Sequence, residues 1–219
     1  MTVRTARPKR PVKRARPRRP VRVVEVNGDS ASGRKAAHSD RILRATADHA
    51  DVILGCEFFN IDAAKSLGPN WIVEQRGRTG SADASYIVAV RRVRGEVVKG
   101  RLRLGSTSLL SVGVRKRSWL TAWVEIDGRD AIRLSFGHAP PKRAWLRWPA
   151  YMAAAPGGVV GADFNKWRRA VKVRFPRRVV RQLPRELLGI VIPKRIPSTR
   201  ARRLDVGGDH HAVAVTLWP

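Results

Sequence analysis

The sequence has one cysteine, no long apolar run and few acidic residues, and each shortage excludes a class of protein. Cys56 has no second cysteine to pair with, which excludes an internal disulfide. No run of about 18 apolar residues occurs, so no transmembrane helix is expected. The N-terminus is charged and lacks the apolar segment of a secretory signal. We therefore expect a soluble, intracellular protein that does not bind a membrane.

The shortage of acidic residues leaves a large positive charge. Lys and Arg number 45 and Asp and Glu number 17, which gives a net charge of +28 over 219 residues. The length and the apolar content of 43% are sufficient for one domain with a substantial core. Because such an excess repels itself, we expect a polyanionic partner that neutralises it through phosphate contacts. A solvated basic surface without a partner is the alternative.

The N-terminal segment is strongly basic. Residues 1–20, MTVRTARPKRPVKRARPRRP, are Arg, Lys and Pro with little else. Proline blocks helix formation and like charges repel, so this segment is expected to be a disordered arm. We interpret the arm as an electrostatic tether to nucleic acid; a solubility or targeting tail is the alternative. Residues 21–219 form the predicted folded domain.

The folded domain is rich in strand signals. VRVVEVNGD (21–29), a helix beginning near Ser39 as N-cap, and DVILGCEFF (51–59) predict a strand–helix–strand unit. A second helix is expected at 141–154. Further strands are expected at 85–90, 106–114, 118–126, 130–136, 158–164, 187–192 and 211–218. Many strands and few helices predict two packed sheets with helices outside.

Polar side chains stand at the ends of five of these expected strands. They are Asn27 with Asp29, Glu57, His138, Asp163 with Asn165, and Asp209 with His210. Each end taken alone is explained by a strand and an Asx-type turn, but five in one chain indicate a site. Oxygen donors of this kind suit Mg²⁺, Mn²⁺ or Ca²⁺, and the histidine spacing does not fit zinc. Histidines beside such a metal fit phosphoester hydrolysis.

The order of these motifs resembles the endonuclease/exonuclease/phosphatase superfamily, which has the DNase I-like fold. The motifs are Asn27 with Asp29, CEFF, GHAPP, GADFN and GDHHAV, and the resemblance covers residues 21–218. It implies an α/β (α+β) protein: a four-layer α/β/β/α sandwich of two packed mixed sheets, with the site at one end of both sheets.

The resemblance also implies a metal site. Glu57 would be the main ligand of Mg²⁺ (or Mn²⁺). Asn27, Asp29 and Asp209 would assist it directly or through water.

The resemblance further implies four catalytic residues. Asp163 would position or activate the attacking water, and Asn165 would hold that water or the phosphate. His210 and His138 would contact the scissile phosphate, stabilise the transition state or protonate the leaving group.

One departure from the family motif concerns the last histidine. The family carries an aspartate in an "IDY"-like strand that pairs with this histidine, and here Gly189 of LLGIVI takes that place. His210 would then lack its usual orienting carboxylate, unless Asp205 substitutes for it. This change raises the alternative of a catalytically weakened protein.

Basic clusters decide among the substrates of the superfamily. They recur along the chain rather than in one pocket, which favours a polymer: nucleic acid, and DNA before RNA. We expect a divalent-metal-dependent nuclease. The alternatives are a phosphodiesterase or phosphatase acting on a small or lipid phosphate, and a DNase I-like nucleic-acid-binding protein with a weakened site. The residues expected to contact nucleic acid are Arg115, Lys116, Arg117, Lys142, Arg143, Lys166, Arg168 and Arg169.

Overall fold

The structure is a computed structural model that describes residues 19–28, 36–76, 84–104, 118–127, 130–139, 148–153, 155, 157–165, 168–184, 186–208 and 211–219. Nearly all of the basic arm and the strand expected at 106–114 lie outside these ranges. None of the helices in the described ranges is long and apolar enough to cross a membrane.

The described strands form two mixed sheets of six strands each. The first has the order β11 (Arg202–Leu204), β12 (Ala212–Leu217), β1 (Val21–Asn27), β2 (Val52–Phe59), β4 (Ala84–Arg91), β3 (Trp71–Arg76). The second has the order β5 (Gly95–Leu104), β6 (Ser118–Ile126), β7 (Ile132–His138), β8 (Val159–Asp163), β10 (Leu188–Pro193), β9 (Arg178–Gln182).

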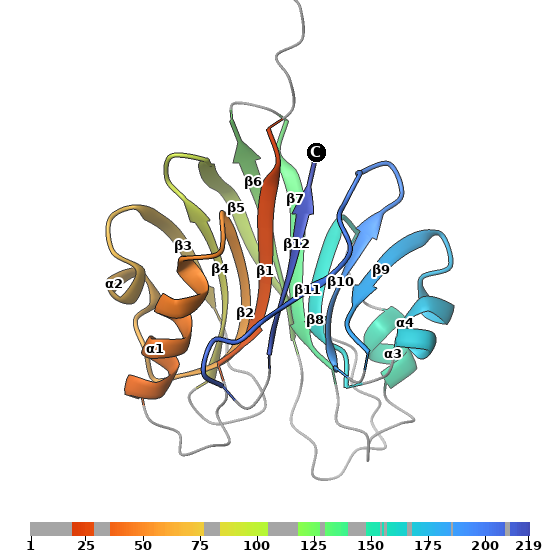
Figure 1. The fold of residues 1–219 in the computed structure, drawn as a ribbon, viewed down its shortest axis with the longest axis horizontal. Helices are drawn as coiled ribbons and strands as arrows, with labels where there is room; N and C mark the ends of the chain where they lie inside the picture. The colour runs from red at the N-terminus through yellow and green to blue at the C-terminus, as the bar shows by residue number, and fades with distance from the viewer. Residues whose placement is uncertain are drawn as a thin grey trace, which may run out of the picture.

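Helices cover the outer faces of both sheets, as Figure 1 shows. On one side lie α1 (Ala36–Ala47) and α2 (Ala63–Leu67), and on the other lie α3 (Trp148–Ala153) and α4 (Arg168–Arg174). The order of layers is helix, sheet, sheet, helix, which confirms the predicted four-layer sandwich. Three apolar clusters hold the layers together, one between the sheets and one beneath each helical layer.

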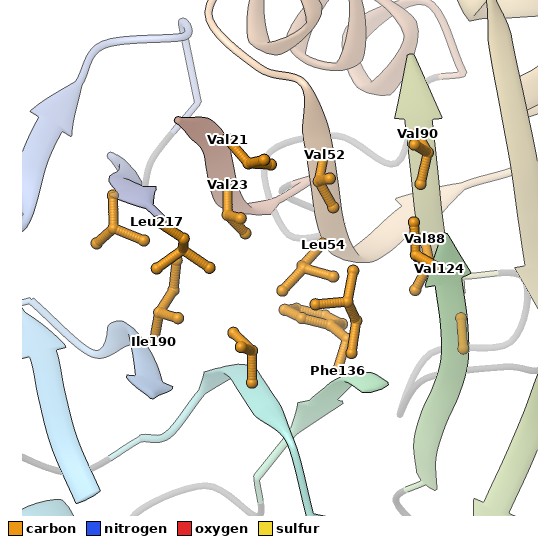
Figure 2. Close-up of a cluster of buried hydrophobic side chains, with 14 of the residues drawn as sticks. Val21, Val23, Val52, Leu54, Val88, Val90, Val124, Phe136, Ile190 and Leu217 are labelled. Carbon is orange, nitrogen blue, oxygen red and sulfur yellow. The ribbon is translucent and has the colours of Figure 1, made fainter. Parts of the chain in front are cut away.

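Strand alternation explains how one sheet serves two of these clusters. Val21 and Val23 of β1 enter the cluster between the sheets, whereas Val24 and Val26 pack beneath α1. Figure 2 shows the cluster between the sheets, where valines and leucines of the first sheet face Phe136 and Ile190 of the second. Both faces of each sheet are therefore buried, which accounts for the near-continuous apolar runs in the sequence.

Each sheet contains one parallel pair of strands, and each pair is joined through a helix. β1 runs parallel to β2 through α1, and β7 runs parallel to β8 through α3. Every other described pair is antiparallel. The two strand–helix–strand units bring the carboxyl ends of four strands to one end of the sandwich, which is where open α/β sheets hold their ligands.

The structure corrects one prediction about a helix and describes part of another. α1 begins at Ala36, so Ser39 lies inside the helix and is not its N-cap. Its hydroxyl donates to the Gly28 carbonyl and accepts from the Phe59 amide, which ties α1 to the ends of β1 and β2. Of the helix expected at 141–154, the described part is α3 (Trp148–Ala153), and residues 141–147 and 154 lie outside the described ranges.

Candidate active site

Four side chains meet at the carboxyl ends of the two parallel strand pairs. Asn27 ends β1, Glu57 lies near the end of β2, His138 ends β7 and Asp163 ends β8. His138 Nδ1 lies 3.0 Å from Glu57 Oε1, and its Nε2 lies 3.7 Å from Asp163 Oδ2. Asn27 Nδ2 donates to Glu57 Oε2 at 3.0 Å and to Asp163 Oδ2 at 3.4 Å. Two carboxylates from different sheets therefore share one imidazole and one amide.

The four side chains differ in exposure in a way that suits a site. The side chains of His138 and Asp163 are 6% and 4% exposed, whereas Glu57 is 18% exposed. Hydrogen bonds in such a dry environment are stronger than in water. Glu57 is thus oriented from the inside by His138 and Asn27 and presents its outer side toward solvent.

A β-bulge places Glu57. The pairing of β2 with β4 shifts register between Gly55 and Phe58, and Glu57 in the bulge has φ = 57°. Bulges re-aim side chains and are common beside active sites, and a positive φ in a non-glycine residue costs free energy. Phe58, the next residue, packs where a Cβ on Gly28 or Gly55 would lie, so its position beside the bulge requires glycine at both places.

The segment after β8 is an Asx-type turn that also braces the site. The backbone N–H of Asn165 donates to Asp163 Oδ1 at 3.0 Å, and Asn165 has φ = 50°. The Asn165 side chain donates to the Ala139 carbonyl at 2.9 Å. Asn165 therefore joins Ala139, the residue after β7, to Asp163, the last residue of β8, and this fixes His138 and Asp163 relative to each other.

A buried carboxyl group that the motifs do not include lies next to this cluster. Glu25 of β1 is fully buried, and its two carboxyl oxygens have no hydrogen-bond partner among the described residues. Burial, and secondly the charge of Asp163, raise the pKa of Glu25 well above its ordinary value; the Gly189 amide opposes this without reaching hydrogen-bond geometry. Its position was readable from the sequence, because Glu25 and Asn27 share one face of β1.

The sheet register shows which residues of β10 face the site. Leu188 pairs with Asp163, and Gly189 pairs with Ala162, which packs beneath the helices. Directly opposite residues share a face, so Leu188 is the β10 residue on the site face and Gly189 points away from it. The site face of β10 therefore carries an apolar side chain, Leu188, and neither Leu188 nor Gly189 supplies a carboxylate there.

Several predicted site residues lie outside the described residues. These are Asp29, Asp209, His210 and the basic residues Arg115, Lys116, Arg117, Lys142, Arg143 and Lys166. Of the residues expected to contact nucleic acid, Arg168 and Arg169 are described, and both are exposed at the start of α4.

Comparison with solved structures decides the fold. The catalytic domain of human Nocturnin, solved with a bound sulfate, matches with a TM-score of 0.69 and 14% identity over 90% of this chain and 93% of that one. A mannosyl-6-phosphatase from Bacteroides thetaiotaomicron matches with a TM-score of 0.68 and 13% identity over 90% and 99%. The chain has the DNase I-like fold.

A third match with the DNase I-like fold carries a nucleic acid. It is Danio rerio TDP2 in complex with a single-strand DNA product, with a TM-score of 0.65 and 13% identity over 90% of this chain and 98% of that one. No protein-family model and no curated protein matches this sequence. The resemblance inferred from the motifs is therefore confirmed at the level of the fold.

The donor chemistry at this end of the DNase I-like sandwich fits a magnesium ion. Within the described residues, no three His, Cys, Asp or Glu side chains are arranged to hold a metal. Mg²⁺, however, keeps several waters and is commonly bound by only one or two carboxylates. A carboxylate accommodates about four contacts, so Glu57 can ligate a cation while bonded to His138 and Asn27. Further oxygen ligands would come from Asp29 and Asp209, which lie outside the described part.

Proposed function

We propose that the chain is a divalent-metal-dependent phosphodiesterase, and specifically a nuclease that hydrolyses DNA or RNA. The observation that carries this proposal is the contact chain Glu57–His138–Asp163, assembled from both sheets at the carboxyl ends of their parallel strands. A metal at Glu57 would supply Lewis-acid stabilisation of the charge that develops on the phosphoryl oxygens.

Residues of the chain have the remaining catalytic and positioning roles. Asp163 accepts a proton from the attacking water, whose oxygen forms the new bond to phosphorus while the bond to the leaving oxygen breaks. His138 holds Asp163 and Glu57 at a fixed separation and donates a hydrogen bond to Glu57. Asn27 donates to both carboxylates and keeps them oriented in the absence of substrate. One water is consumed for each phosphodiester bond.

Charge favours a polymeric substrate. Solved structures with this fold include a mannosyl-6-phosphatase and a TDP2 bound to a DNA product, so the fold alone does not select the substrate. A net charge of +28, distributed along the whole chain, exceeds what one small phosphate requires and matches a polyphosphate backbone.

A panel of substrates tests this assignment. Purified protein with Mg²⁺ or Mn²⁺ would be given single-stranded DNA, single-stranded RNA and a sugar phosphomonoester at equal phosphate concentration. We expect cleavage of at least one polynucleotide, none after EDTA, and little release of inorganic phosphate. Rapid hydrolysis of the monoester with intact polynucleotides would contradict the proposal and favour the phosphatase alternative.

One observation favours a second function, a nucleic-acid-binding protein with a weakened site. Gly189 takes the motif place of the carboxylate that orients the last histidine, and the β10 residue on the site face is the apolar Leu188. This function predicts tight polynucleotide binding without metal-dependent cleavage. A gel-shift assay run alongside the substrate panel separates the two proposals.

A further inference from the structure

Three arginines from separate parts of the chain line one pocket, here called the arginine pocket. They are Arg168 from α4, Arg181 from β9 and Arg200 from the segment before β11. The pocket encloses about 380 Å³ at the free edge of β9, which is an end strand of its sheet. This volume is ample for a phosphate group and its waters.

The charges in this pocket are not balanced by neighbouring acids. Within the described residues, none of Arg168, Arg181 and Arg200 forms an ion pair with a carboxylate, and the carboxyl group of the nearby Glu186 contacts none of them. Burial, and secondly the charges of Arg168 and Arg200, lower the pKa of Arg181. Like charges held together in this way are unfavourable until an anion joins them.

Arg181 is also fixed in position. Its Nε donates to Ser198 Oγ at 3.2 Å, and its Nη2 donates to the Ser198 carbonyl at 3.1 Å. Nη1 has no hydrogen-bond partner among the described residues. A guanidinium anchored on one side with a donor remaining on the other is preorganised for a phosphate oxygen.

The pocket lies at the same end of the sandwich as the site. Gln182, which lines it, pairs with Gly189 of β10, and the neighbouring Leu188 pairs with Asp163. Two strand spacings separate β9 from β8, so the pocket begins about 10 Å from Asp163 across the sheet. At a rise of about 3.4 Å per nucleotide, this is a span of about three nucleotides of one strand.

We propose that the arginine pocket binds a backbone phosphate of the polynucleotide whose scissile bond lies at the Glu57–His138–Asp163 site. This inference rests on the proposed function, because it takes the substrate to be a polynucleotide. The pocket would fix the direction and register in which the strand crosses the site. The chemical class it recognises is a phosphodiester, and inorganic phosphate shares that chemistry.

Equilibrium binding with the full chain tests the proposal independently of catalysis. A fluorescent single-stranded oligonucleotide would be titrated in EDTA, so that cleavage cannot contribute. The test variant is Arg168→Gln with Arg200→Gln, which changes two exposed side chains and leaves the anchored Arg181 in place. The matched control is Arg174→Gln with Arg177→Gln, which removes equal charge from exposed positions outside the pocket.

We expect the pocket variant to bind about tenfold more weakly than the control variant. The steepness of its plot of log affinity against log salt should also fall by about one more than that of the control variant. Equal binding by the two variants would overturn the proposal even if the wild type cleaves DNA. A loss of inorganic phosphate binding without loss of oligonucleotide binding would assign the pocket to free phosphate and would also overturn it. A pocket-dependent oligonucleotide affinity in a chain that shows no cleavage would support the pocket while the proposed activity failed.

Discussion

Glu25 lies where ionisation of a carboxyl group is energetically unfavourable. It is fully buried beside Asp163, and burial and that neighbouring charge both raise its pKa. Between the ordinary pKa of 4.5 and the raised value, the folded state holds a proton that the unfolded state has released. The stabilisation from this proton is therefore complete below pH 4.5 and is lost as the pH rises through the raised pKa.

Replacing Glu25 with glutamine tests this account. Glu25→Gln keeps the shape and removes the ionisation, so it should increase the free energy of unfolding at pH 8 by more than about 1 kcal/mol. At pH 4 the variant and the wild type should be nearly equal. Urea unfolding at the two pH values measures this. A variant less stable than the wild type at pH 8 would mean that the ionised carboxylate has a favourable partner, such as a bound cation.

His138 holds two carboxylates that would otherwise repel each other. Because it contacts both Glu57 and Asp163, His138→Ala should lower kcat on polynucleotide by about 10²- to 10⁴-fold. His49→Ala, at an exposed position after α1, is the matched control and should leave kcat unchanged. Single-turnover cleavage with Mg²⁺ measures the effect, and a loss smaller than about threefold would remove His138 from the mechanism.

The sequence predicted which residues face the site better than it predicted their contacts. Strand alternation and motif order brought out Asn27, Glu57, His138 and Asp163, and the structure brings these four together. Alternation of side chains holds only for extended backbone. Glu57 and Asn165 have φ near +50°, so their side-chain directions could not be predicted from the sequence. The sequence also could not show which β10 residue faces the site, because a shift of one residue moves every side chain of a strand to the other face; the structure places Leu188 there.

At the scale of elements, long apolar strands were predictable and edge elements were not. β6 has the predicted bounds 118–126, and the predicted strand–helix–strand unit is β1–α1–β2. Some edge strands and short helices carry too many charges or too few residues to show a periodic pattern of apolar side chains. These are β3, β9, β11, α2 and α4. Arginines on β9 and β11 disfavour pairing of these edges with another chain. The same arginines interrupt the apolar alternation by which a strand is recognised in a sequence.

Close packing behind β7 sets the position of His138. A Cβ on Gly137 would lie 2.5 Å from Trp119 Cε3 and would also overlap the Tyr151 hydroxyl, in a cluster where the Trp119 and Tyr151 rings stack at 4.7 Å. Gly137→Ala should therefore cost about 1–3 kcal/mol of stability by overpacking. Thermal unfolding measures the cost. Gly157→Ala is the control, since its Cβ meets nothing nearer than 3.4 Å, and equal melting temperatures for the two variants would contradict this packing account.

At the scale of the whole molecule, positive charge is the dominant property. Every charged residue in the arm is Lys or Arg, and the structure describes only the last two residues of the arm, Arg19 and Pro20. The Pro20 carbonyl accepts a hydrogen bond from Arg94, and a deletion of residues 1–18 should preserve this contact. The fold therefore anchors the arm at the start of β1.

Deleting residues 1–18 should weaken polynucleotide binding and flatten its salt dependence. Each lost phosphate contact should reduce the slope of log affinity against log salt by about 0.7–0.9. Hydrolysis of a small phosphodiester should be unchanged, because the site residues lie at the opposite end of β1 from the arm. Fluorescence anisotropy at several salt concentrations measures the binding. An unchanged slope would show that the arm does not contact the substrate.

Relaxation of supercoiled plasmid with Mg²⁺ is the most direct test of the central claim, that Glu57 and Asp163 form a phosphodiester-cleaving site. The wild type should nick the plasmid, EDTA should abolish nicking, and Glu57→Gln and Asp163→Asn should each abolish it while still shifting the plasmid on a gel. A plasmid that the wild type shifts but never nicks, together with intact single-stranded DNA and RNA, would contradict the claim. So would nicking that survives both substitutions.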